Sequence, residues 1–378
     1  MRMMLTNNPF ITDPAVFAVG NNYQIMAVTN EELLFFVEVN GKRYYDHSNG
    51  VLRSKMRAHR VVIPMKEVDD ARAYVVCFRR VYCRKGDFSE TGEIERIKYA
   101  FRPVPKTGEI CIYQISDAHQ KPDLPQKSAM YYGKKLHLLI INGDTFDYCN
   151  TEEDFDYLYR LIADVTHGEL PVVFAKGNHD NKGVVAEKLS VYTPVRDGKS
   201  YYTFRLGCIW GLVLDSGENC VDTSPEYGNT VCHHEFRQEE TKYIKDVISR
   251  FVQEYAAEGI EYRMIVSHCA INNVRCKPFD IEVDIYQEWV NLINTYIRPD
   301  FMMSGHLHIT TVCMPDDVLD TLGLNCPVII GANPVGWQTG ILTDFIGCAV
   351  SLQKDKVTVR FTDTQQKVVE THTFFKKF

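Results

Sequence analysis

The stretch "LPVVFAKGNHDNKG", residues 170 to 183, joins an apolar run to a turn in which Asn178, His179 and Asp180 follow a glycine. The apolar run has the length and composition of a buried strand. A His-Asp pair on its own is typical of a hydrogen-bonded surface turn. Its meaning therefore depends on which other polar side chains stand at the ends of strands in this chain.

The same pattern recurs along the sequence, since several short apolar runs end in acidic or imidazole side chains. The polar residues are Asp117 and His119 in "SDAHQ", Asp144 in "NGDTFDY", His268 in "VSHC", and His306 with His308 in "GHLH". In layered α/β folds, ligands bind outside the carboxyl ends of the strands. We therefore expect these side chains to converge in space although they are far apart in the sequence.

The rhythm of the chain changes near residue 105. Residues 1–105 contain β-branched and aromatic runs separated by turn signals, which predict a small all-β domain resembling an immunoglobulin or fibronectin-III sandwich. Residues 106–378 alternate apolar strands with helical stretches, including one helix over 234–259, and predict an α/β layered domain. The period-two tail is expected to close a sheet edge as a hairpin or meander.

Composition and charge indicate which binding partners and which cellular compartment to expect. The net charge of -7 gives no general attraction to nucleic acid or to an anionic membrane, so a phosphate-bearing substrate must be captured locally. No apolar run approaches the roughly 20 residues of a membrane span, and the first twenty residues lack a secretory pattern. The 12 cysteines are scattered without a CxxC pair, which favours thiols in the cytoplasm.

The strand-end residues have the chemistry of metal ligands. Together they offer two carboxylates, four imidazoles besides His179, and the amide oxygen of Asn178, with no thiolate. This mixture of hard and borderline donors suits manganese, iron or zinc. In Asp117-x-His119 and His306-x-His308, an extended chain would send the two side chains in opposite directions, so these residues must lie on turns or straddle two ions.

The set also matches a known signature, DxH, GDxxD, GNH[DE], a lone His after a strand, and GHxH. The elements are Asp117-Ala118-His119, Gly143-Asp144-Thr145-Phe146-Asp147, Gly177-Asn178-His179-Asp180, His268 and Gly305-His306-Leu307-His308. Over about residues 110 to 350 the chain thus resembles the calcineurin-like metallophosphoesterase superfamily. The resemblance implies a four-layer α/β/β/α fold with a dinuclear metal site at the ends of its sheets.

The resemblance also implies a role for each residue. The first metal ion would be held by Asp117, His119, Asp144 and His308, and the second by Asp144, Asn178, His268 and His306. His179 is similar to the family histidine that binds a phosphate oxygen or protonates the leaving oxygen, and Asp180 would orient it by a hydrogen bond. We expect two divalent ions, manganese first, with iron or zinc as alternatives.

Departures from the signature bear on the substrate. Protein phosphatases of this group carry Arg and Glu where this chain has Tyr148 and Asp180, and purple acid phosphatases need a Tyr where it has Asp147. The combination of DxH with GNHD looks more like the phosphodiesterase branch. Trp337 in the loop "ANPVGWQTG" is a candidate stacking wall beside the site.

The predicted function is hydrolysis of a phosphodiester or phosphomonoester of a small molecule or nucleotide, by in-line attack of a hydroxide that bridges the two ions. One alternative is a catalytically weak scaffold that binds a partner through the N-terminal β domain. Another is a nuclease, which the acidic net charge and the lack of a basic tract disfavour. The sequence gives no indication of an oligomeric state.

Overall fold

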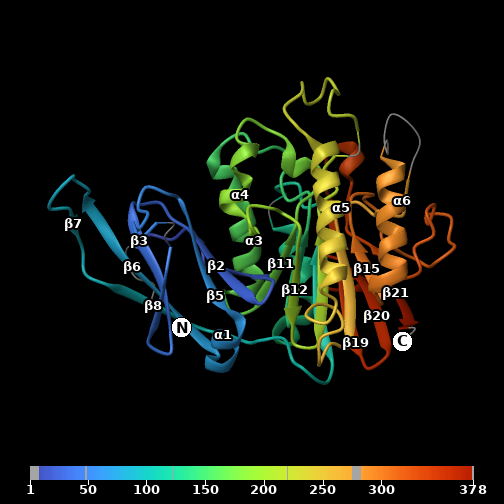
Figure 1. Cartoon of the computed structure of the whole chain (residues 1–378), viewed down its shortest axis with the longest axis horizontal. Coiled ribbons are helices and arrows are strands. Elements are labelled where there is room, and N and C mark those ends of the chain that lie inside the picture. The colour runs from blue at the N-terminus through green and yellow to red at the C-terminus, as the bar shows by residue number, and fades with distance from the viewer. Residues whose placement is uncertain (1–7, 47–48, 122, 219, 275–281, 377–378) are drawn as a thin grey trace.

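The computed structural model describes residues 8–46, 49–121, 123–218, 220–274 and 282–376 (Figure 1). Its first sheet has ten strands in the order β21-β20-β19-β9-β10-β11-β1-β2-β5, with β18 paired to β19. The bounds are β1 Ala15–Val19, β2 Asn22–Val28, β5 Ala58–Pro64, β9 Ile110–Ile115, β10 Leu138–Asn142, β11 Pro171–Ala175, β18 Asn333–Val335, β19 Asp344–Gln353, β20 Lys356–Thr362 and β21 Val368–Phe375.

The centre of this sheet is parallel and buried. Strands β9, β10 and β11 pair in parallel, and all of their residues are buried. Strands buried on both faces read as continuous apolar runs, which is the pattern that the sequence shows here. Strands β19, β20 and β21 add an antiparallel meander beside β9, which confirms the expected closure of a sheet edge by the tail.

A second sheet of six strands, in the order β12-β13-β14-β15-β17-β16, packs against the first. Its strands are β12 Tyr202–Leu206, β13 Ile209–Leu214, β14 Tyr262–Ser267, β15 Phe301–Ser304, β16 Thr311–Cys313 and β17 Val328–Ile330. One buried cluster joins the inner faces of both sheets, with Ile112 and Ile140 from the first and Val213 and Met264 from the second. This apolar core lies beneath the strand ends that carry the predicted ligands.

Helices cover the outer faces of the two sheets (Figure 1). They are α2 Leu124–Ala129, α3 Asp156–Thr166, α4 Leu189–Tyr192, α5 His233–Ser249 and α6 Val283–Leu292, whereas α1 Met65–Ala71 packs beside β5 and β6 in the N-terminal region. Leu158 and Ile162 of α3 pack with Leu139 and Val172 of the first sheet, whereas α5 and α6 pack on the second sheet. The layers therefore run helix, sheet, sheet, helix, which confirms the predicted fold class. Among the described residues, none of these helices combines the length and apolar character of a membrane span.

Helix α5 is shorter than the sequence predicts. It ends at Ser249 rather than continuing to residue 259, and Phe251, expected on its buried face, is 47% exposed. In the turns that follow, Glu254 accepts a hydrogen bond from Trp210 Nε1 of β13 at 3.0 Å. A tertiary contact thus holds residues outside the helix that the apolar spacing alone would include in it.

The N-terminal region is rich in strands, as expected, but it divides between two sheets. A third sheet contains β3 Leu33–Val39, β4 Lys42–Tyr45, β6 Ala73–Cys83, β7 Glu90–Thr91 and β8 Glu95–Ala100. Strands β1, β2 and β5 instead belong to the first sheet, because β1 pairs in parallel with β11 at Val16–Pro171 and Phe17–Val172. The boundary at residue 105 stays a prediction, and the ten-stranded sheet runs across it.

Side chains of the N-terminal strands also hold α4 and the residues that follow it. Gln24 donates to the carbonyl of Val195 at 2.6 Å and accepts from the Val195 amide at 3.2 Å. Arg60 of β5 donates to the carbonyls of Ser190 and Thr193, each at 2.6 Å. The chain downstream of the Asn178-His179 turn is therefore fixed by residues from the first quarter of the sequence.

We expect a chain truncated to residues 106–378 to lose its cooperative fold. The truncation exposes the β11 edge that β1 covers, removes the Gln24 and Arg60 contacts, and opens the shared apolar core. Soluble yield and a thermal melt followed by circular dichroism measure the effect. Replacing the exposed residues 85–89 between β6 and β7 with two glycines is the control and should preserve the melt. A soluble 106–378 fragment with a single cooperative melt would contradict this prediction.

Candidate metal centre

The predicted site residues follow five strand ends that meet between the two sheets. Asp117 and His119 follow β9, Asp144 follows β10, Asn178 and His179 follow β11, His268 follows β14, and His306 and His308 follow β15. Strands β9, β10 and β11 are parallel neighbours in one sheet, and β14 and β15 are parallel neighbours in the other. The structure thus brings residues from both sheets to one place.

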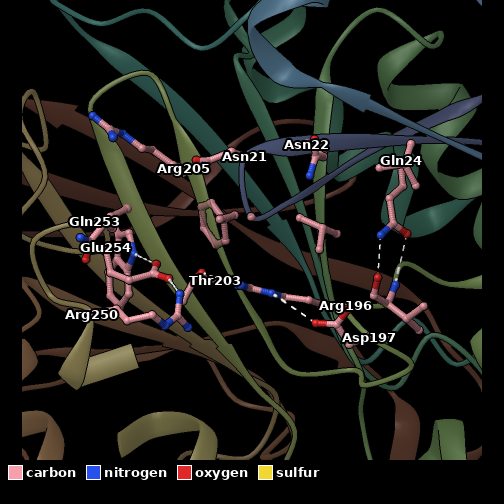
Figure 2. Close-up of a pocket in the computed structure, with 16 residues that line it drawn as sticks. Asn21, Asn22, Gln24, Arg196, Asp197, Thr203, Arg205, Arg250, Gln253 and Glu254 are labelled. Carbon is pink, nitrogen blue, oxygen red and sulfur yellow. Dashed lines mark hydrogen bonds and ion pairs between the residues drawn. The ribbon is translucent and has the colours of Figure 1, made fainter. Parts of the chain in front are cut away.

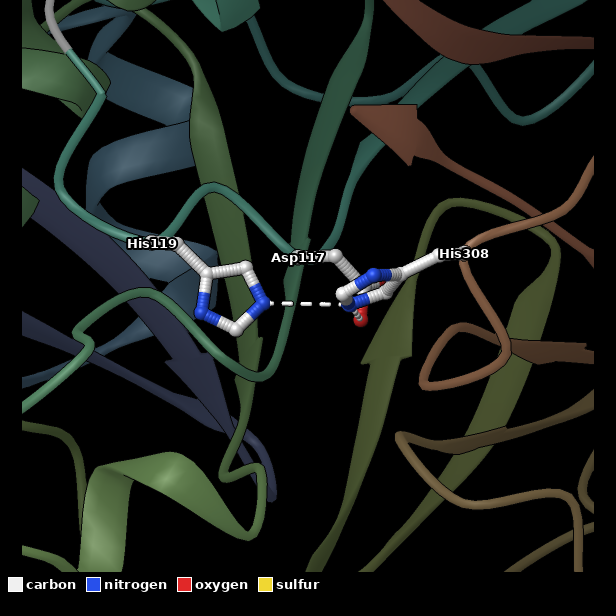
Figure 3. A group of neighbouring side chains, drawn as sticks. All are labelled: Asp117, His119 and His308. Carbon is white, nitrogen blue, oxygen red and sulfur yellow. Dashed lines mark hydrogen bonds and ion pairs between the residues drawn. The ribbon is translucent and has the colours of Figure 1, made fainter. Parts of the chain in front are cut away.

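The first group of donor atoms comes from Asp117, His119 and His308 (Figure 3). The Nε2 atoms of the two histidines are 3.1 Å apart, and His308 Nε2 is 3.4 Å from Asp117 Oδ1. Asp117 and His119 are fully buried, and the His308 side chain is 22% exposed. These are three of the four residues expected to hold the first ion.

The second group comes from Asp144, His268 and His306. Asp144 Oδ2 is 3.1 Å from His268 Nε2, and the Oδ1 atom of Asn178 is 3.0 Å from His306 Nδ1. Asp144 Oδ2 also faces the first group, at 3.9 Å from His119 Nε2. One oxygen of Asp144 therefore lies between the two groups, where the sequence predicts a bridging carboxylate.

Asp147 joins the site as a residue whose role the sequence reasoning missed. Its Oδ1 atom is 2.8 Å from His119 Nδ1, and its backbone carbonyl is 3.3 Å from His179 Nδ1. The rings of His119 and His179 meet edge to face at 4.8 Å. Asp147 is the last residue of the GDxxD motif, so its position in that motif was the available signal.

The expected hydrogen bond between Asp180 and His179 is wrong, because Asp180 bonds to other groups. The Oδ2 and Oδ1 atoms of Asp180 accept from the backbone amides of Gly177, at 2.8 Å, and Phe146, at 3.1 Å. Asp180 is fully buried, and its side chain ties the third motif to the second. The group that orients the His179 ring is instead the Asp147 backbone carbonyl. The Asp180 side chain points into the core and so cannot reach His179 on the other side of the turn.

Turns with left-handed backbone aim the ligands. Asp117, His119, Asp144, His306 and His308 all have φ between 47° and 68°, a region costly for residues other than glycine. This conformation explains how Asp-x-His and His-x-His pairs can face one site, as the alternation argument required. Strain of about 1–3 kcal/mol per residue is typical of functional sites whose surroundings over-determine the backbone.

Buried amides in the strands hold the two sheets in register beneath the site. Gln114 Nε2 donates to the carbonyls of Ser304 and Gly331, at 2.9 and 2.5 Å, and Asn142 Nδ2 donates to Met303 at 3.0 Å. The backbone carbonyl oxygen of Asn142 is 2.7 Å from His268 Nδ1. A carbonyl only accepts, so His268 Nδ1 carries the proton and its Nε2 faces Asp144. The polar residues inside apolar strands were the signal for this role, which the motifs do not include.

The electrostatics of the cluster favour bound cations. Burial disfavours the charged form of His268, yet Asp144 and Asp117 outweigh it and raise its pKa to about 10. Burial likewise opposes ionisation of Asp117 and Asp144, but neighbouring histidines, His268 foremost, hold the pKa of both carboxyls below the usual range. The two carboxylates thus favour a positive charge at this position, which the His268 proton supplies in the metal-free protein and which a divalent cation would supply in its place. The carboxylate and imidazole donors are those that divalent transition metals fit.

Trp337 lies against two of the predicted ligands. Its ring stacks on His119 with centroids 4.1 Å apart, and it meets His308 edge to face at 5.1 Å. Lys121 Nζ lies 5.2 Å from the centroid of the same ring. The indole therefore covers one side of the first group of donors.

A cleft of about 530 Å³ lies elsewhere on the molecule (Figure 2). It is bounded by the β1–β2 turn, β12 and the end of α5, with Arg196, Arg205 and Arg250 among its lining residues. Arg250 is paired with Glu254, and Arg196 lies 3.9 Å from Asp197. The predicted site residues do not line this cleft, so its size says nothing about the metal centre.

The motif glycines permit the close approach of the ligand turns. A Cβ atom on Gly177 would lie 2.2 Å from the Asp144 backbone nitrogen and 2.3 Å from its Oδ1 atom. A Cβ on Gly305 would lie 2.7 Å from Asp117 Oδ2. A side chain at either position would displace a predicted ligand.

We therefore expect Gly177→Ala to destabilise the metal-free protein by about 1–3 kcal/mol, the usual cost of overpacking. The same change should weaken metal binding, because Asp144 has to move. Urea unfolding in EDTA and metal analysis of the reloaded protein measure the two effects. Gly86→Ala, where an added Cβ meets open space, is the control. An unfolding curve for Gly177→Ala that overlays the wild type would disprove the packing argument.

Comparison with known proteins agrees with this geometry. A relative in Fibrobacter succinogenes, described as a probable cyclic nucleotide phosphodiesterase, is 29% identical over 137 residues, which cover 33% of this chain and 52% of that protein. The match thus spans about half the length of this relative. Its described activity belongs to that protein.

Two solved structures share the fold across almost the whole chain. A purple acid phosphatase from yellow lupin (Lupinus luteus) seeds aligns with a TM-score of 0.59 at 10% identity, over 97% of this chain and 74% of that one. PhoD aligns with a TM-score of 0.56 at 10% identity, over 99% and 92%. The family model described as calcineurin-like phosphoesterase matches residues 111–310, which is more than half of the sequence. The chain belongs to the calcineurin-like phosphoesterase family.

Proposed function

We propose that this protein is a metal-dependent phosphohydrolase that cleaves a phosphodiester or phosphomonoester of a small molecule or nucleotide. The observation that carries the proposal is the pair of donor groups on either side of Asp144, with His179 against the first group. Family membership supports the same chemistry. The description of the Fibrobacter relative favours a phosphodiester over a monoester.

Seven residues would hold the metal ions. Asp117, His119 and His308 would bind the first ion, Asn178, His268 and His306 the second, and Asp144 both. Two divalent cations, when bound, would neutralise charge on the phosphoryl oxygens and acidify a water molecule. The mixed oxygen and nitrogen donors suit manganese first, and iron or zinc as alternatives.

His179 is the residue that we propose for binding a phosphoryl oxygen or protonating the leaving group. A carbonyl only accepts hydrogen bonds, so the contact with the Asp147 carbonyl places a proton on His179 Nδ1. Nε2 is then the atom that gains or releases the second proton. Burial lowers the pKa of His179, and the Asp144 carboxylate opposes that effect. Histidine is the side chain most often used for general acid catalysis, and Nε2 of His179 is the atom placed to carry it out.

Local cations would capture the anionic substrate in spite of the acidic net charge. Lys121 Nζ lies 3.4 Å from Asp147 Oδ2, and its side chain is 34% exposed at the edge of the site. Tyr148, 54% exposed, lies with its ring 6.5 Å from that of His179. A lysine and an exposed aromatic ring beside the acid candidate would suit a phosphoester with a planar leaving group.

We expect the purified protein, stripped with EDTA and reloaded with manganese, to hydrolyse bis-p-nitrophenyl phosphate faster than p-nitrophenyl phosphate. His179→Asn should lower kcat by about 100-fold to 10,000-fold with the metal content unchanged, because proton transfer is lost while every proposed metal ligand remains. Asp144→Asn should lower the metal content itself. Release of p-nitrophenol and mass-spectrometric metal analysis provide the two readouts.

His372→Asn, a change to a partly exposed histidine on β21 that pairs with Glu370, is the matched control and should keep wild-type activity. Absence of hydrolysis of either ester by the manganese-loaded wild type would overturn the proposal. Fewer than one bound ion per chain after loading would favour the scaffold alternative instead.

A further inference from the structure

The candidate ligand Asn178 has a buried acidic neighbour outside the family signature. Glu218 lies after β13, is 5% exposed, and its Oε2 atom accepts from Asn178 Nδ2 at 3.2 Å. On the opposite side of the same amide, Asn178 Oδ1 is 3.0 Å from His306 Nδ1. The amide of Asn178 therefore lies between a carboxylate and the second group of metal donors.

The chemistry of the two neighbours sets the direction of the amide. A carboxylate only accepts, so the group of Asn178 that faces Glu218 has to be its NH₂. The carbonyl oxygen, the only atom of the amide able to bind a cation, is then turned toward His306. Rotation of the amide by half a turn would present NH₂ to the metal position and set two acceptors against each other at Glu218.

Further contacts hold the Glu218 carboxylate in place. Tyr227, 7% exposed, donates from its hydroxyl to Glu218 Oε2 at 3.0 Å, and Lys182 Nζ is 3.7 Å from the same atom. The fully buried Arg237 of α5 donates to the backbone carbonyls of Glu218, at 2.8 Å, and Ser216, at 2.7 Å. Tyr227 and Lys182 thus fix the carboxylate oxygen that faces Asn178, and Arg237 fixes the backbone that carries it.

We propose that Glu218 is a positioning residue that keeps the Asn178 carbonyl oxygen directed at the second metal ion. The inference rests on the proposed function, and it adds a residue from the loop after β13 to the machinery of the site. Partners that orient metal ligands in this way typically contribute about 10-fold to 100-fold to metal affinity. Glu218 would thus act through Asn178 without contacting the ion or the substrate.

Calorimetric titration of the EDTA-stripped full-length protein with Mn²⁺ tests this assignment. Glu218→Met fills the side-chain volume but cannot accept the amide hydrogen bond, so it should weaken binding of the second ion by about 10-fold to 100-fold and leave the first unchanged. Glu218→Gln keeps an acceptor oxygen and should bind close to wild type. Glu226→Gln, which alters the other carboxylate that pairs with Lys182, is the matched control and should also bind both ions normally.

A rescue experiment separates orientation from general damage to the fold. Asn178→Asp presents an oxygen in either orientation of its side chain, so adding it to Glu218→Met should restore binding of the second ion. Melting in EDTA should be similar for all of these variants, and Glu218→Ala replaces Glu218→Met if the latter does not fold.

The outcomes distinguish this inference from the function on which it rests. Equal affinities for the second ion in wild type and Glu218→Met, or equal losses in Glu218→Met and Glu218→Gln, would overturn the positioning role. A double variant as weak as Glu218→Met would overturn it as well. Failure of the wild type itself to bind two ions or to hydrolyse either ester would count against the proposed function instead.

Discussion

The site depends on a set of buried amide hydrogen bonds that fix one sheet against the other. Gln114 and Asn142, on neighbouring strands of the first sheet, bond to each other at 2.9 Å and to backbone carbonyls around β15 in the second. An apolar interface resists sliding only weakly, whereas a buried amide left without its partner costs about 1–3 kcal/mol. These bonds therefore set the register in which turns from both sheets meet.

Rigid support of this kind makes the unusual backbone of the ligands tolerable. The His306 amide donates one bifurcated hydrogen bond to both oxygens of Asp117, at 3.0 and 3.1 Å, and Ser116 Oγ donates to Asp117 Oδ2 at 2.7 Å. Asp144 Oδ1 receives the His179 amide at 2.8 Å. Each carboxylate thus holds a neighbouring ligand turn, while Oδ1 of Asp117 also faces His308 and Oδ2 of Asp144 faces His268. The ligands support one another across the gap between the sheets.

Much of this arrangement is readable from the sequence, because strand ends carry it. Apolar runs followed at once by Asp, Asn or His give both the layered fold and the convergence of the ligands. The hydrogen-bond partner of a turn side chain cannot be predicted in this way, because it depends on whether that side chain points into the core or outward. Asp180 is expected to bond to His179, but it points into the core and accepts from the amides of Gly177 and Phe146. The pairing of β1 with β11 also escaped prediction, since more than 150 residues separate Val16 from Pro171 and local pattern carries no information on such pairs.

The stacking of Trp337 on His119 gives the metal centre two unlike sides. The indole lies on the His119 ring next to the loop after β18, whereas Tyr148 is exposed on the side of His179. An aromatic ring packed on one predicted ligand would shield that ligand from water on the packed face. If a substrate approaches on the side of Tyr148, its leaving group would depart beside the histidine that is proposed to protonate it.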